Sequence, residues 1–74
     1  SRSMTMIDWN KWKPNVDGAL ALLAEGGNGY DGKLYMEVGI YKPWSMPTIN
    51  ALRRRGYRVE TLAPCVFLLH PKTN

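Results

Sequence analysis

The sequence predicts a small two-layer α+β domain, with two helices on one face of a three-stranded, mostly antiparallel sheet. Three observations support this fold class. A chain of 74 residues has room for a single hydrophobic core. A composition of 45% hydrophobic and 22% charged residues is ordinary for a globular protein. Apolar periodicity follows the order helix, strand, helix, strand, strand, which is typical of a helical layer packed on a sheet.

The first helix is predicted to follow Pro14 and to end at Gly26, because glycine readily adopts the left-handed conformation found at helix ends. Asn15 or Asp17 can cap its beginning. Its apolar residues recur at the spacing of one helical face and are Val16, Ala19, Leu20 and Leu23.

Residues 33–41 alternate between apolar and polar, which predicts a half-buried strand after a flexible glycine-rich turn at 26–32. The residues expected to face the core are Leu34, Met36, Val38 and Ile40. Those expected to face outward are Lys33, Tyr35, Glu37 and Tyr41.

A second helix is predicted at about 46–55, with Ser45 as its cap, Pro47 in its first turn and Gly56 at its end. Met46, Ile49 and Leu52 are expected to face the core.

Residues 57–63 and 65–69 read as two strands around Pro64. The last strand is apolar on both faces, which indicates that it is covered, and Cys65 is expected to be buried in it. A helix followed by a strand pair is also the second half of a winged helix. A complete winged helix would need another helix before Ser45, where a strand is predicted instead.

The expected organisation is one domain with short extensions. Trp9 and Trp12 share one face of a helical turn and are expected to dock on the core. The predicted parts are a cloning remnant (1–3), an N-terminal arm (4–13), a single α+β domain (14–70) and a C-terminal tail (71–74).

The sequence predicts no enzyme, cofactor or metal site. Cys65 and His70 are the only cysteine and the only histidine, so neither an internal disulfide nor a zinc site of four Cys or His ligands can form. Their five-residue separation would place them on opposite faces of a strand. A lone thiol and an N-terminus without an apolar signal segment favour a reducing, cytoplasmic location.

Basic residues supply the clearest functional pattern, because the chain carries a net charge of +4 and has no acidic residue between Glu37 and Glu60. Arginine forms paired hydrogen bonds to phosphate or guanine, and Asn50 lies one helical turn before Arg54. The predicted nucleic-acid contacts are Lys42, Asn50, Arg53, Arg54, Arg55 and Arg58. The competing interpretation is a solvated helix end whose cations complement the helix dipole.

Aromatic residues could add stacking contacts. Tyr35 and Tyr41, beside Lys33, form a sheet face like those that hold single-stranded nucleic acid, and Trp44 is a further candidate. The same side chains could instead anchor a protein interface or cover the edges of a small core.

The leading hypothesis is a small, basic, non-enzymatic module that contacts nucleic acid through its second helix and the following strand. No run approaches the ~20 apolar residues of a membrane span, so we expect no membrane partner. A homodimer is compatible with a core this small. The alternative is a small phage-type or microbial accessory protein that binds and modulates or inhibits a larger host protein through an acidic surface of that partner.

A resemblance keeps this alternative open. Residues 37–38 (Glu-Val), 40–41 (Ile-Tyr), 56–57 (Gly-Tyr) and 64–66 (Pro-Cys-Val) make the second half of the chain similar to small phage proteins that inhibit host RNA polymerase. The similarity covers about half of the chain and includes gaps. It implies a strand–helix–strand unit and a protein partner.

Overall fold

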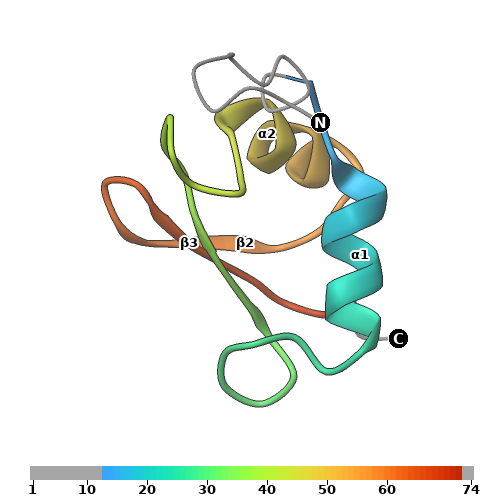
Figure 1. Ribbon diagram of the computed structural model, residues 1–74. Coiled ribbons are helices and arrows are strands. Elements are labelled where there is room, and N and C mark those ends of the chain that lie inside the picture. The colour runs from blue at the N-terminus through green and yellow to red at the C-terminus, as the bar shows by residue number, and fades with distance from the viewer. Residues whose placement is uncertain (1–12, 73–74) are drawn as a thin grey trace, which may run out of the picture.

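The computed structural model describes residues 13–72 and has the predicted α+β fold (Figure 1). Its elements are α1 (Val16–Ala24), β1 (Leu34–Glu37), α2 (Met46–Arg54), β2 (Val59–Ala63) and β3 (Val66–Leu69). The strands form an antiparallel sheet in the order β1-β3-β2. The predictions for residues 1–12, including Trp9 and Trp12, lie outside the described part of the chain. Within that part, no helix has the length and apolar character needed to cross a membrane.

The helices begin and end close to the predicted positions. At the start of α1, Asn15 Oδ1 accepts a hydrogen bond from the Gly18 amide at 3.2 Å, which confirms the predicted cap. Gly56, with φ +89°, follows the last turn of α2, where a glycine favours the reversal of the chain. Ser45 precedes α2 as expected, but its buried hydroxyl makes no cap bond.

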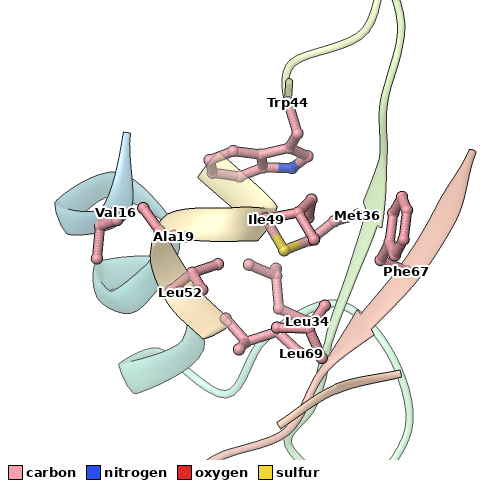
Figure 2. Packing of buried hydrophobic residues seen from close by; sticks show 11 residues of the cluster. Val16, Ala19, Leu34, Met36, Trp44, Ile49, Leu52, Phe67 and Leu69 are labelled. Carbon is pink, nitrogen blue, oxygen red and sulfur yellow. The ribbon is translucent and has the colours of Figure 1, made fainter. Parts of the chain in front are cut away.

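The core lies between the helices and one face of the sheet. Leu34 and Met36 of β1 and Leu69 of β3 meet Ile49 and Leu52 of α2, and all five are almost completely buried (Figure 2). The Trp44 indole closes one end of this cluster and is only 6% exposed. The buried apolar area is the main stabilising contribution in a domain of this size.

A polar contact joins the two helices. The Asn15 amide, just before α1, donates to Thr48 Oγ1 of α2 at 3.0 Å, and Thr48 is 1% exposed. The hydroxyl thus satisfies an amide that the helix itself leaves unpaired. This contact brings the beginning of α1 next to α2.

Several sequence-based expectations are corrected at the strand ends. Ile40 is 63% exposed rather than buried, because β1 ends at Glu37 and the chain then turns, with the Lys42 amide donating to Gly39 O at 3.2 Å. Cys65 is exposed, because it belongs to the turn between β2 and β3. Met46 is 39% exposed, and Thr48 and Ala51 take inward positions beside Ile49 and Leu52.

Candidate functional site

Arg53 is bound to the protein itself. Its Nη2 donates to the Val59 carbonyl at 2.8 Å and to Thr61 Oγ1 at 3.2 Å, both on β2. Its guanidinium carbon lies 5.6 Å from the centre of the Phe67 ring. These contacts hold α2 against the edge strand β2, so the Arg53 guanidinium is used within the fold.

Arg54 and Arg55 differ from Arg53, although they are its neighbours in sequence. Within residues 13–72, their side chains form no hydrogen bond or ion pair, and both residues are exposed. They line a hollow between the start of α1 and the end of α2, where Asp17 is the one carboxylate among the described lining residues. Asn50 is also exposed on α2, one turn before Arg54.

The strand register aligns a second group of polar side chains. Leu34 of β1 and Val59 of β2 both pair with Leu69 of β3. Continuing this register by one residue sets Lys33, His70 and Arg58 side by side, and the His70 amide donates to Arg58 O at 3.0 Å. Since side chains alternate along a strand, this row projects from the sheet face that points away from the helices.

This row opens onto a hollow that residues near the C-terminus complete. The hollow has a volume of about 380 Å³ and is lined by Lys33, Gly56, Arg58, His70, Pro71 and Lys72. We call it the Lys33 hollow. Three of its lining residues are Lys or Arg, and none is acidic.

Lys72 connects the Lys33 hollow with the end of α2. Its Nζ donates to the Arg55 carbonyl at 3.0 Å and lies 4.5 Å from the centre of the Tyr57 ring. Both contacts hold the ammonium beside the turn that follows α2. The cationic residues next to this turn lie at two hollows, Arg54 and Arg55 at the one between the helices and Arg58 and Lys72 at the Lys33 hollow, and we call these four residues together the basic surface.

Glu60 offsets part of this charge. Its Oε1 lies 3.8 Å from Arg58 Nη2 and 2.9 Å from His70 Nε2. The side chain of Arg58 is 73% exposed, and the separation of the charged atoms is long, so the Arg58–Glu60 pair contributes little to stability. Arg58 can therefore turn toward an external anion at small cost.

Lys42, by contrast, lies away from the basic surface. Its Nζ is 2.8 Å from Glu37 Oε2 at the end of β1 opposite to Lys33. A strand rises ~3.3 Å per residue, so this position lies roughly 13 Å from Lys33 along β1. The hydrogen bond that Lys42 donates to Glu37, followed by the negative charge of Glu37, raises the pKa of Lys42 above 10.5.

The three candidate aromatic residues do not form one exposed platform. Tyr35 projects outward as predicted and is 37% exposed, whereas Trp44 belongs to the core and Tyr41 lies in the exposed turn after β1. Tyr35 and Trp44 line a smaller hollow together with Lys42. This third hollow is separate from the basic surface, because none of its lining residues belongs to that surface.

The structure thus divides the predicted contacts and adds others. Arg54 and Arg55 line one hollow and Arg58 lines another, whereas Arg53 and Lys42 have partners elsewhere. Sequence reasoning missed the contribution of Lys72, which it assigned to a tail, and of His70. Lys33 was expected to face outward, but its position beside Arg58 follows only from the strand register.

Among residues 13–72, no three His, Cys, Asp or Glu side chains are grouped so that they could hold a metal ion. Comparisons of this chain with protein-family models, with curated proteins and with solved structures give no match. The similarity of its second half to phage inhibitors therefore gains no support from them.

Proposed function

We propose that this protein is a non-enzymatic binding module that contacts the phosphates of nucleic acid through the basic surface. The observation that carries the proposal is that four cationic residues line the two hollows next to the turn that ends α2, which the hydrogen bond from Lys72 Nζ to the Arg55 carbonyl connects: Arg54, Arg55, Arg58 and Lys72. Phosphate contacts provide most of the affinity of sequence-independent binding.

Side-chain chemistry favours phosphate as the group that is bound. The guanidinium groups of Arg54 and Arg55 have no partner among the described residues, so they can donate paired hydrogen bonds to phosphate oxygens. Asn50 lies on the same exposed side of α2 as Arg54 and could add a contact to a base or sugar. Arg53 and Lys42 are left out of this surface, since their charged groups are used within the fold.

The salt dependence of binding tests this proposal. Fluorescence anisotropy would follow a labelled oligonucleotide of mixed sequence, as a single strand and as a duplex, at increasing potassium chloride. If the four cations each neutralise one phosphate, the plot of log affinity against log salt should have a slope of about −2.8 for the single strand and about −3.6 for the duplex. An affinity that does not change with salt would contradict the proposal.

A pair of matched variants assigns the effect to the basic surface. Arg55→Gln and Lys42→Gln each remove one positive charge. Arg55→Gln should weaken binding several-fold and make the slope about 0.7–0.9 less steep, whereas Lys42→Gln should leave the slope nearly unchanged. Equal effects of the two variants would show that only net charge matters and would remove this surface from the proposal.

An acidic protein partner is the other outcome of the same experiment. A cationic surface attracts any complementary negative surface. If neither oligonucleotide binds at low salt, and a stoichiometric complex with an acidic protein depends on Arg54 and Arg55, the nucleic-acid proposal is overturned in favour of a protein-binding accessory role.

A further inference from the structure

The Lys33 hollow has the composition of an anion site. Its charged lining residues come from three separate segments: Lys33 precedes β1, Arg58 lies between α2 and β2, and Lys72 follows β3. Cations that approach from several directions suit a compact anion with several oxygens better than a nucleic-acid backbone, in which each phosphodiester carries a single charge.

The carboxylate beside Arg58 is already bound to another side chain. Glu60 is not among the lining residues, and its Oε1 is 2.9 Å from His70 Nε2. This contact draws Glu60 toward His70 and leaves Arg58 with a long 3.8 Å separation. The Arg58 guanidinium therefore keeps most of its five N–H donors for a ligand.

Lys72 is held in place before any ligand arrives. The Arg55 carbonyl and the Tyr57 ring fix the position of its Nζ, and an ammonium group with one such hydrogen bond has two further donors. The carbonyl end of α2 would by itself repel an anion. Lys72 Nζ donates a hydrogen bond to the Arg55 carbonyl at this end, and its positive charge offsets the negative partial charge that would repel an anion.

We infer that the Lys33 hollow binds a phosphate monoester dianion. This inference deepens the proposed function, on which it rests for the relevance of phosphate. Three cations that face one hollow balance a dianion better than the single charge of a backbone phosphodiester, and their donors can reach its terminal oxygens. The group could belong to the phosphorylated end of a nucleic acid or to a small phosphorylated metabolite.

The first test is a titration of the full chain with inorganic phosphate at constant ionic strength, followed by amide NMR. We expect saturable shifts confined to the residues around the Lys33 hollow, and none with chloride. Lys33→Gln should weaken phosphate binding about threefold or more, which corresponds to the loss of one charged contact, while Lys42→Gln should leave it unchanged. Non-saturable shifts, or equal effects of the two variants, would overturn the inference.

The second test distinguishes the two sources of the dianion. Two oligonucleotides of identical sequence, one with a 5′-phosphate and one with a 5′-hydroxyl, are compared, and ribose 5-phosphate is compared with ribose. A preference for the 5′-phosphate that Lys33→Gln abolishes supports the nucleic-acid end. Saturable binding of ribose 5-phosphate without such a preference supports a small metabolite.

The two proposals fail in different ways. If oligonucleotides bind with the expected salt dependence but no phosphate monoester binds to the hollow, the inference is wrong and the proposed function stands. If phosphate saturates the hollow and no oligonucleotide binds, the proposed function is wrong and the anion site stands.

Discussion

At the scale of single residues, identical side chains have different roles because their backbones point them to different surroundings. Arg53 and Arg54 are neighbours, yet successive residues of a helix point ~100° apart. This rotation turns Arg53 onto β2, where it donates to Val59 O, and leaves Arg54 in solvent beside Arg55. An arginine-rich helix end therefore contains both a structural contact and a candidate binding surface.

The Lys42–Glu37 pair gives a prediction about titration. Its raised pKa means that the folded protein holds this proton more tightly than the unfolded chain does. The resulting stabilisation is fully present below the ordinary lysine value of 10.5 and disappears as the pH rises through the higher value in the folded state. Both side chains are exposed, so the effect on stability should be small.

NMR of the lysine side chains can measure this shift. We expect Glu37→Gln to lower the pKa of Lys42 toward 10.5, because it removes both the charged hydrogen-bond partner and its negative charge. Glu60→Gln, which removes a carboxylate elsewhere on the sheet, should leave the pKa of Lys42 unchanged. An unchanged Lys42 pKa in Glu37→Gln would contradict the pairing.

At the scale of elements, the glycine-rich loop that connects α1 to β1 is held in place by hydrogen bonds to Lys33 and β1. The amides of Asn28 and Gly29 both donate to Lys33 O, at 3.2 and 2.8 Å. The Asn28 side chain also accepts a hydrogen bond from the Tyr35 amide at 2.6 Å and donates one to the Tyr35 carbonyl at 3.3 Å. Because β1 is an edge strand, Asn28 occupies backbone groups that another strand could otherwise pair with.

Two glycines of this loop provide a stability prediction. Both Gly27 (φ +69°) and Gly32 (φ +76°) adopt the left-handed conformation, but a Cβ on Gly27 would lie 2.2 Å from Lys33 O, whereas one on Gly32 meets nothing within 4 Å. Gly32→Ala should cost about 1 kcal/mol of unfolding free energy through backbone strain alone. Gly27→Ala should cost about 1–3 kcal/mol more, because the backbone must move to relieve the clash.

Urea unfolding of the two variants measures this difference. The losses of unfolding free energy are compared at the same temperature. If both variants keep the m-value of the parent chain, the losses report stability rather than a change in the unfolded state. Equal losses would mean that the close approach of Gly27 to Lys33 does not exist in solution.

At the scale of the whole molecule, stability and binding should depend on different arginines. Arg53→Met keeps the aliphatic length of the side chain but removes the bonds to Val59 O and Thr61 Oγ1. We expect a loss of about 1–3 kcal/mol in unfolding free energy, with the salt slope of oligonucleotide binding changed much less than by Arg55→Gln.

Arg55→Gln is the matched variant with the opposite profile. Its side chain has no partner among the described residues, so its unfolding free energy should stay within about 0.5 kcal/mol of the parent chain, while its binding weakens. Thermal or urea unfolding measures the stability of each variant, and fluorescence anisotropy on the same preparations measures its affinity for the oligonucleotide. A destabilised Arg55→Gln protein, or an unaffected Arg53→Met protein, would reverse the roles assigned to the two residues.

The sequence alone was sufficient for the order of the elements, because apolar periodicity and turn residues act over a few neighbours. The alternation of Leu34 and Met36 with outward residues and the stop at Gly56 are local signals of this kind, and both appear in the structure. The partners of the charged side chains depend instead on strand register and helix rotation. Only the tertiary structure therefore decided that Arg53 binds β2, that Lys42 pairs with Glu37, and that Lys33 and Lys72 share a hollow with Arg58. The Lys33 hollow in particular joins segments far apart in the sequence, whose relative positions depend on how the whole core packs.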